Sequence, residues 1–448
     1  MAEKIIIGKD WKDLKKFGEI GTAFIGKHVV GKGEDSHLTN PILMDLTRPH
    51  ILLVCGKRGS GKSYSAGLVS EEIYNLPDEI RKNISVLMID TMGIYWSMKL
   101  PNEKDAEILK KWGIKPQGLP NAKIFIPEGH VADYTKSGIK VDNPFTLAVS
   151  ELTAEDWAVT FGFSMIDDHG IVIERVVDAI RESRTEYSID DIITAVQNDK
   201  DAEKRVKLAV INRMQAAKEW GVFAQKGTKV EELLQPGVVS ILDVSHFMRV
   251  SSGSWSVRAM LVALLSRKIF DQRLKARKAE EYSQVTGQTA KTMPMVWLMI
   301  DEAHQFVPSE GSTAATGPLL TLIKEGREPG ISLLMITQRP NKLHADALSQ
   351  SDMIISHRLT SKSDIDALRS IMQTYMLEDI QDYLNDLPRT KGAAIILDDN
   401  SERIYQAQMR PRFSWHAGGS PIIIKEKSLI GGGYEKPKKP GELTKEKL

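Results

Sequence analysis

The chain has 448 residues, enough for two or three domains, and its 60 Lys and Arg nearly balance its 59 Asp and Glu. The formal charge of +1 excludes a protein that is basic overall, so a polyanion site must come from local clustering. The single cysteine, Cys55, excludes an intramolecular disulfide. Because the sequence has neither a signal peptide nor a run of about 18 apolar residues, we expect a cytoplasmic protein without membrane insertion.

The first 48 residues contain short apolar segments, 19–30 and 41–45, that are interrupted by glycines. Such spacing is typical of short strands joined by turns. We therefore predict a short, barrel-like N-terminal β region over residues 1–48.

The most informative stretch is the apolar run Ile51–Cys55 followed by Gly-Lys-Arg-Gly-Ser-Gly-Lys-Ser and a segment with helical spacing. This is the pattern G-x-x-x-x-G-K-[ST] in its expected strand, loop and helix context, and it predicts binding of a nucleoside triphosphate. The residues predicted to bind ATP are Gly56, Lys57, Arg58, Gly59, Ser60, Gly61, Lys62, Ser63 and Tyr64.

Each residue type in this loop suits a phosphate chain. Glycines let successive backbone N–H groups converge on phosphate oxygens beside a helix N-terminus. Lys62 is predicted to reach the β and γ phosphates as a catalytic cation, and the Ser63 hydroxyl to bind Mg²⁺.

A second strand is predicted over residues 86–90, within a first part of the ATPase core that spans residues 49–145. Asp90 ends this strand and would face the nucleotide edge of a parallel sheet. A turn aspartate that only ends the strand explains the same residue equally well.

Helical patterns dominate residues 146–235, with predicted capping residues at Thr153 and Ser188, and they indicate an all-α insertion. One of these helices is basic and would suit DNA, although a solvated helix face is the more common explanation. Its cationic residues are Arg205, Lys207, Arg213 and Lys218.

The core is predicted to resume over residues 236–413, with a strand at 238–244 and a helix at 255–277. The end of that helix and the residue after it are densely basic, which also complements the helix macrodipole. The cations there are Arg267, Lys268, Arg273, Lys275, Arg277 and Lys278.

A further apolar strand, 295–301, ends in Asp301-Glu302-Ala303-His304. Asp301 is placed to hold Mg²⁺, and Glu302 to polarise the attacking water as the catalytic base. Because phosphoryl transfer needs both roles, two adjacent acids together with the phosphate loop indicate ATP hydrolysis.

Two more catalytic residues are predicted around the strand Ile331–Thr337. Gln338 at its end would orient water or contact the γ phosphate, and Arg327 on the turn before it would act as an arginine finger toward a neighbouring subunit. An ordinary strand cap and a surface ion pair are the structural alternatives. Further strands are expected at 353–359, 393–398 and 403–409, a helix at 364–384, and a flexible tail over 414–448.

The ordered motifs resemble those of the HerA branch of the HerA/FtsK ATPases. The residues that carry this resemblance are Gly-Lys-Arg-Gly-Ser-Gly-Lys-Ser, Asp90-Thr-Met-Gly, Asp301-Glu-Ala-His, Lys324-Glu-Gly-Arg and Thr337-Gln-Arg-Pro. The resemblance implies an α/β fold with a RecA-like P-loop core around a mainly parallel sheet. It also implies ATP and Mg²⁺ as cofactors, and a homo-oligomer, a hexameric ring, that translocates double-stranded DNA. For archaeal members it further implies a NurA nuclease partner in DNA end processing.

The sequence departs from the family pattern at two places. Gly93-Ile94-Tyr95 lacks the acid that commonly follows this glycine, and the N-terminal region is short where the nuclease is expected to dock. A nucleotide-switched assembly or coupling ATPase of a mobile element, conjugation or defence system therefore stays open as the alternative. A superfamily 2 helicase does not fit, because the chain has no room for a second RecA-like domain after residue 337.

Overall fold

A computed structural model of the chain describes residues 3–249, 254–287, 293–372 and 380–419. Residues up to 417 form one compact unit, to which this description applies. Its strands are β1 (Ile5–Ile7), β2 (Thr22–Val30), β3 (His37–Asp45), β4 (Ile51–Cys55), β5 (Ile84–Asp90), β6 (Lys123–Pro127), β7 (Asn143–Phe145), β8 (Leu147–Ala148), β9 (Phe223–Ala224), β10 (Val239–Asp243), β11 (Met295–Ile300), β12 (Ile331–Thr337), β13 (Met353–His357), β14 (Ala393–Asp398) and β15 (Arg403–Met409).

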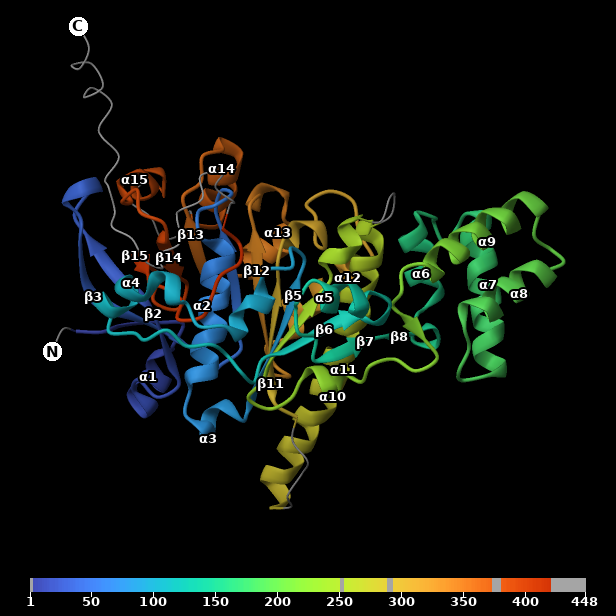
Figure 1. Cartoon of the computed structure of the whole chain (residues 1–448), viewed down its shortest axis with the longest axis horizontal. Coiled ribbons are helices and arrows are strands. Elements are labelled where there is room, and N and C mark those ends of the chain that lie inside the picture. Colours follow the sequence, from blue (N-terminus) through green and yellow to red (C-terminus); the bar gives the residue numbers. More distant parts are fainter. Residues whose placement is uncertain (1–2, 250–253, 288–292, 373–379, 420–448) are drawn as a thin grey trace, which may run out of the picture. The chain divides into compact units, whose positions relative to one another are not determined.

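Helices lie between many of these strands, and α6 to α9 follow one another without a strand (Figure 1). They are α1 (Trp11–Phe17), α2 (Lys62–Asn75), α3 (Asp78–Arg81), α4 (Ala106–Lys111), α5 (Val131–Lys136), α6 (Ala154–Phe161), α7 (Asp168–Ser183), α8 (Ile189–Asn198), α9 (Lys204–Lys218), α10 (Val230–Leu233), α11 (Ser254–Thr286), α12 (Thr316–Glu325), α13 (Ala345–Ser349), α14 (Lys362–Met372) and α15 (Ile380–Asp386).

One 13-stranded sheet runs through the unit in the order β1-β3-β2-β15-β14-β13-β4-β12-β11-β5-β10-β6-β7. From β13 to β7 all pairs are parallel. The predicted α/β class with a mainly parallel sheet is confirmed. Parallel strands share one carboxyl edge, and ligands of such sheets bind there.

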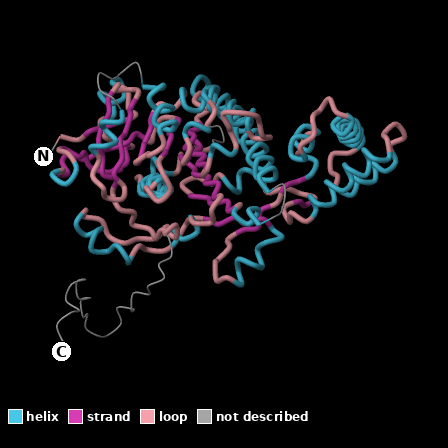
Figure 2. Tube along the Cα trace, turned by 90° about the horizontal axis from the view of Figure 1, so that it is seen from above, coloured by secondary structure: helices cyan, strands magenta, loops and turns pink. Residues whose placement is uncertain are grey.

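The central strands β4, β5, β10, β12 and β13 are buried throughout and mostly apolar, because helices cover both faces of the sheet (Figure 2). In β4, Leu53 and Cys55 join one core cluster and Leu52 and Val54 join the other, as the two-residue period of a strand requires. Burial raises the pKa of the Cys55 thiol to about 12, so this cysteine is a core residue and not a nucleophile.

The N-terminal β region differs from the barrel-like appendage that the sequence predicted. β2 pairs with β15 at Gly26 and Met409, so β1 to β3 extend the central sheet itself. The helix α1 was not expected, although Asp10 caps it by accepting a hydrogen bond from the Asp13 N–H. Glycines interrupt the apolar pattern of β2, so the sequence did not predict that this strand pairs with β15, almost 400 residues later in the chain.

The helical segment consists of α6 to α9 in the expected place. Both predicted capping boxes form, Thr153 with Asp156 and Ser188 with Asp191. Its two ends meet where β8 pairs with β9, so the chain leaves and re-enters the core at one point. The exact domain boundaries remain predictions.

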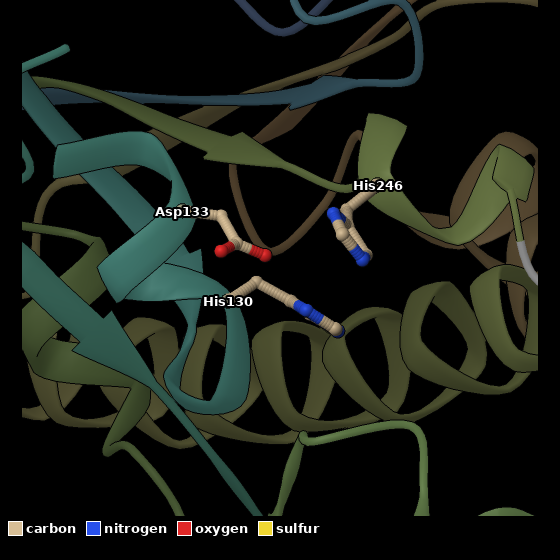
Figure 3. A group of neighbouring side chains, drawn as sticks. All are labelled: His130, Asp133 and His246. Carbon is tan, nitrogen blue, oxygen red and sulfur yellow. The ribbon is translucent and has the colours of Figure 1, made fainter. Parts of the chain in front are cut away.

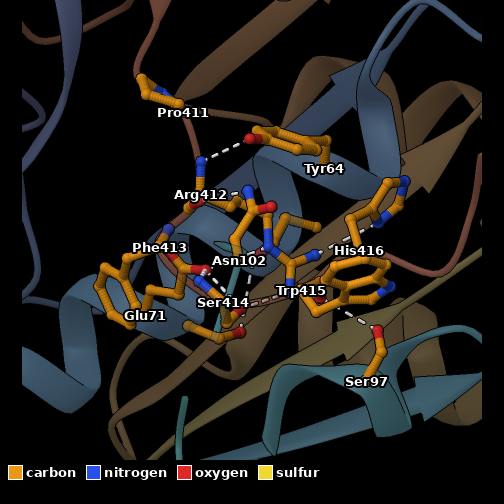
Figure 4. Close-up of polar contacts among 12 residues, drawn as sticks. Tyr64, Glu71, Ser97, Asn102, Pro411, Arg412, Phe413, Ser414, Trp415 and His416 are labelled. Carbon is orange, nitrogen blue, oxygen red and sulfur yellow. Dashed lines mark hydrogen bonds and ion pairs between the residues drawn. The ribbon is translucent and has the colours of Figure 1, made fainter. Parts of the chain in front are cut away.

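The structure differs from the predicted bounds for a helix of the core and for the C-terminal tail. α11 continues to Thr286, beyond the predicted end at 277, and part of the predicted helix 364–384 lies outside the described residues. The predicted start of the tail at residue 414 is too early, because Ser414 donates a hydrogen bond to buried Glu71 (Figure 4) and the Trp415 N–H donates to the Leu100 carbonyl. Residues 420–448 of that tail also lie outside the described residues.

Candidate functional site

The phosphate loop lies between β4 and α2 at the carboxyl edge of the sheet. Gly56, Gly59 and Gly61 have φ of 148°, 76° and 119°, values that side chains rarely allow. A Cβ on Gly56 would lie 2.7 Å from the Cβ of His357, so the loop also needs glycine for close packing. The sequence motif therefore has the backbone that a phosphate cradle requires.

Lys62 and Ser63 open the helix that follows. The Lys62 ammonium donates a hydrogen bond to the Lys57 carbonyl at 3.1 Å, and burial lowers its pKa, while Glu302 and Asp301 act in the opposite direction. Ser63 lies against the buried phenol of Tyr95, whose pKa burial and the Asp301 charge raise. Lys62 is thus within electrostatic reach of the two acids that the sequence assigns to hydrolysis, and Ser63 neighbours Tyr95, whose pKa responds to one of them.

The side chain of His357 packs against the phosphate loop at Gly56, a role that sequence patterns did not assign. This buried side chain ends β13, and its Nε2 lies 2.9 Å from the Ser65 hydroxyl on α2. The next residue, Arg358, accepts a hydrogen bond from Lys57 N through its carbonyl. Burial lowers the pKa of His357 to about 4, so the ring is neutral at neutral pH and adds no charge beneath the phosphates.

Asp301 follows β11, two strands from the loop, because β12 lies between β11 and β4. Its Oδ1 accepts the N–H of Glu302 at 2.9 Å, while Oδ2 is buried without a hydrogen-bond partner among the described residues. Burial and the neighbouring Glu302 raise the pKa of Asp301 to about 7. An unpaired buried carboxylate oxygen and a serine hydroxyl are the hard oxygen donors that Mg²⁺ prefers, so Asp301 and Ser63 fit this ion.

Glu302 is held in an uncommon backbone conformation, with φ of 53°. Its Oε1 accepts a hydrogen bond from Gln338 Nε2 at 3.3 Å, and Oε2 lies 3.5 Å from His304 Nδ1. Burial raises the pKa of Glu302, and it lowers that of His304 to about 4, so this histidine is a neutral neighbour. The structure therefore brings Glu302 and Gln338 into direct contact.

A cavity of about 200 Å³ opens beside the loop. Three cationic residues line it together with Gln338, and their charge suits phosphate oxygens. These residues are Lys57, Arg58 and Arg339. The positive charge of Arg339 also acts to lower the pKa of Glu302, an interaction that sequence patterns did not predict.

Asp90 does not point to a nucleotide. Its carboxylate accepts four backbone hydrogen bonds, from Met92, Gly93, Ile94 and Tyr95, at 2.7 to 3.1 Å. It therefore orders the turn after β5, which was the structural alternative for this residue.

Arg327 is not part of this group. Its guanidinium lies 3.7 Å from Asp352, which in turn accepts the N–H of Ile51 at the start of β4. The phosphate loop follows the other end of β4, roughly 16 Å away for a five-residue strand. The Arg327 side chain is 69% exposed, so it is free to meet another molecule but not its own phosphate loop.

Most of the basic residues on α9 and α11 have intramolecular partners. Lys218 pairs with Asp190, and Lys207 binds the Gln197 and Asp199 carbonyls. Arg267 forms a bidentate pair with Asp156. These contacts favour structural roles over DNA binding for the cations concerned.

No helix in the described ranges has both the length and the apolar character that crossing a membrane requires.

Comparison with known proteins gives matches in sequence and in fold. A family model described as "Helicase HerA, central domain" matches residues 25–269. The "DNA double-strand break repair helicase HerA" of Pyrococcus furiosus is 26% identical over 175 residues, 37% of this chain and 31% of that protein. A probable HerA helicase of Methanocaldococcus jannaschii is 36% identical over 69 residues, 15% of this chain and 14% of that protein. The matched segments thus span about a third or less of these relatives.

Among solved structures, VirB4 of Thermoanaerobacter pseudethanolicus superposes with a TM-score of 0.53 at 12% identity. The superposition covers 86% of this chain and 97% of that one. At this identity the likeness concerns the fold.

Proposed function

The chain belongs to the HerA helicase family and has its ATPase core, and on this premise we propose that it is an ATP-hydrolysing motor that translocates double-stranded DNA. The observation that carries the proposal is the convergence of Lys62, Ser63, Asp301, Glu302 and Gln338 at one edge of the sheet. These groups supply the roles that phosphoryl transfer to water requires.

The roles follow from the contacts. The backbone of residues 56–61 and the Lys62 ammonium neutralise the phosphates, and Ser63 and Asp301 would hold Mg²⁺, which spreads the developing charge. Glu302, with its raised pKa and its contact to Gln338, takes the proton of the attacking water. A bound cation would keep both adjacent acids ionised.

Arg327 is the residue that supports an oligomer. Its exposed position at the amino edge suits a group that completes the site of the next subunit, because a ring presents opposite edges of neighbouring subunits to each other. We propose a homo-hexamer, in which each site is completed in trans.

The test measures ATP hydrolysis and movement together. Purified protein is assayed for phosphate release with and without linear duplex DNA, and for displacement of a triplex-forming strand from that DNA. We expect duplex DNA to stimulate hydrolysis and the third strand to be released only with ATP; the Lys62→Ala protein serves as the control without hydrolysis. A rate unchanged by duplex DNA, in a protein that stays monomeric at micromolar concentration with nucleotide, would overturn the motor.

The same assay distinguishes the motor from the alternative, a nucleotide-switched coupling ATPase. Hydrolysis without strand displacement favours a nucleotide-switched coupling ATPase. The relatives are described as a double-strand break repair helicase and a probable one, which supports a role in DNA double-strand break repair. As the family resemblance implies, we propose that this role is DNA end processing with a NurA-like nuclease. Addition of such a nuclease should then accelerate resection of a linear duplex, and no acceleration would remove that partner.

A further inference from the structure

A second group of ligand-type side chains lies away from the phosphate loop. His130, Asp133 and His246 each present one donor atom, and these atoms lie within 4.8 Å of one another. Figure 3 shows the carboxylate and the two rings directed into one space between α5 and the segment after β10. Sequence patterns did not predict this group, because its members are 116 residues apart at the extremes and no spacing motif links them.

The parallel sheet explains why they meet. β6 and β10 are neighbours, and His130 follows the end of β6 while His246 belongs to the short helix Ser245–Arg249 that follows β10. A hydrogen bond of 3.1 Å between the hydroxyls of Tyr134 and Ser245 joins these two segments next to the group. The backbone thus holds the three side chains together.

The contacts of His130 determine its tautomer. Its Nε2 lies 3.0 Å from the Trp220 carbonyl oxygen, which can only accept, so the hydrogen of the neutral ring is on Nε2. Nδ1 therefore keeps its lone pair. A histidine that donates its second N–H to a backbone carbonyl is the usual arrangement at protein metal sites.

We propose that His130, Asp133 and His246 bind a divalent transition-metal ion, with Zn²⁺ as the best match. Two imidazole nitrogens and one carboxylate oxygen are zinc ligands, whereas Mg²⁺ and Ca²⁺ prefer oxygen alone. The site is therefore chemically distinct from the Mg²⁺ site proposed at Ser63 and Asp301. It does not depend on the proposed motor function.

Binding requires small side-chain movements. Donors of a tetrahedral Zn²⁺ site lie about 3.3 Å apart, so the donor atoms, which lie within 4.8 Å of one another, must close in by up to about 1.5 Å. The two rings are stacked, with centroids 3.5 Å apart and planes 25° from parallel, and their lone pairs converge only when one ring turns. Asp133 is exposed and both histidines are half-buried, so these side chains are not locked in a core. The bound ion would then join α5 to the segment that leads into α11.

The experiment titrates chelator-treated full-length protein with ZnCl₂ by equilibrium dialysis, without ATP or DNA, and records the visible spectrum with Co²⁺ in place of zinc. We expect the protein to bind a zinc ion with high affinity and its Co²⁺ form to show the visible spectrum of tetrahedral Co²⁺. His130→Ala, His246→Ala and Asp133→Asn should each weaken zinc binding at least about tenfold. His37→Ala, at an exposed histidine of β3, and Asp301→Asn should both leave this binding unchanged.

Wild-type protein without zinc binding, or Asp133→Asn with wild-type affinity, would overturn the proposal. Because Asp133 is exposed, this variant is expected to fold even if a histidine variant does not, and far-UV circular dichroism checks that. Loss of binding in Asp301→Asn alone would assign the zinc to the nucleotide site instead. Motor assays do not enter these readouts, so the two proposals fail independently.

Discussion

Glu302 combines a left-handed backbone with a buried carboxylate at the end of a strand. A non-glycine residue in this region costs on the order of 1 kcal/mol and is found where function requires it. With this conformation the Glu302 carboxylate contacts Gln338 and acts on Lys62, while the Asp301 carboxylate accepts the N–H of Glu302. Neighbouring acids in one sequence motif thereby reach different positions.

The first prediction concerns this carboxylate. Glu302→Gln should lower the rate of ATP hydrolysis by about 10²- to 10⁴-fold, because an amide cannot accept the proton of the attacking water. Phosphate release gives the rate, and binding of a fluorescent nucleotide should stay near the wild-type level because the loop is intact. Glu310→Gln, at an exposed position, is the matched control. Normal turnover in the Glu302→Gln protein would remove this residue from its role.

A second prediction uses the buried His357. Its pKa of about 4 lies below the ordinary value of 6.5, so the unfolded chain binds more protons between these values. The contribution of neutral His357 to the stability of the folded state is therefore complete above pH 6.5 and is lost as the pH falls toward 4. We expect this residue to lower the free energy of unfolding by about 2 kcal/mol from pH 8 to pH 5. Urea unfolding of wild type and His357→Gln at both pH values measures the difference, and equal pH dependence in the two proteins would contradict it.

At the scale of elements, the position of α2 depends on the segment after β15. Glu71, fully buried on α2, accepts a hydrogen bond from Arg412 Nε at 3.1 Å (Figure 4) and one from Arg410 Nη1 at 3.0 Å. Arg412 N also donates to the Tyr64 hydroxyl at 2.5 Å, one residue after Ser63. The helix that starts at Lys62 is thus tied to a segment more than 300 residues later in the chain.

This network makes a prediction about stability. Glu71→Gln leaves the buried Arg412 guanidinium without a counter-charge and Arg410 with Glu72 alone, and it should reduce the free energy of unfolding by about 3–5 kcal/mol. Asp190→Asn, which breaks the exposed pair with Lys218, should cost no more than about 1 kcal/mol. The midpoint of urea unfolding measures both, and similar midpoints for the two variants would show that the network does not stabilise α2.

At the scale of the whole molecule, the two edges of the sheet carry different halves of the proposed site. The loop, the acids and Gln338 lie at the carboxyl edge, while Arg327 lies with Asp352 at the amino edge. A single chain therefore cannot use Arg327 on its own nucleotide. Assembly decides whether this arginine is catalytic or only a surface residue.

The prediction at this scale is that Arg327→Ala lowers ATP hydrolysis by about 10³-fold or more and spares nucleotide binding, as expected for an arginine finger. Mixing the variant with wild type should depress activity beyond simple dilution, because each inactive subunit also affects its neighbour. Lys324→Ala, which loses only the pair with Asp346, is the control. Full activity in rings made only of Arg327→Ala would dismiss the finger.

The sequence by itself determined the local parts of this protein. Strand β12 has the predicted bounds, the phosphate loop has the predicted glycine conformations, and both capping boxes form, because each depends on residues that are close in the chain. Tertiary structure decided what depends on distant pairing: the N-terminal strands join the central sheet, and His357 packs against the phosphate loop and Ser65. The same holds for His130 and His246, which meet only because β6 and β10 are neighbours. Caps, turns and strand bounds depend on residues that are close in the chain, whereas the order of strands in a sheet depends on packing between residues that are far apart in it.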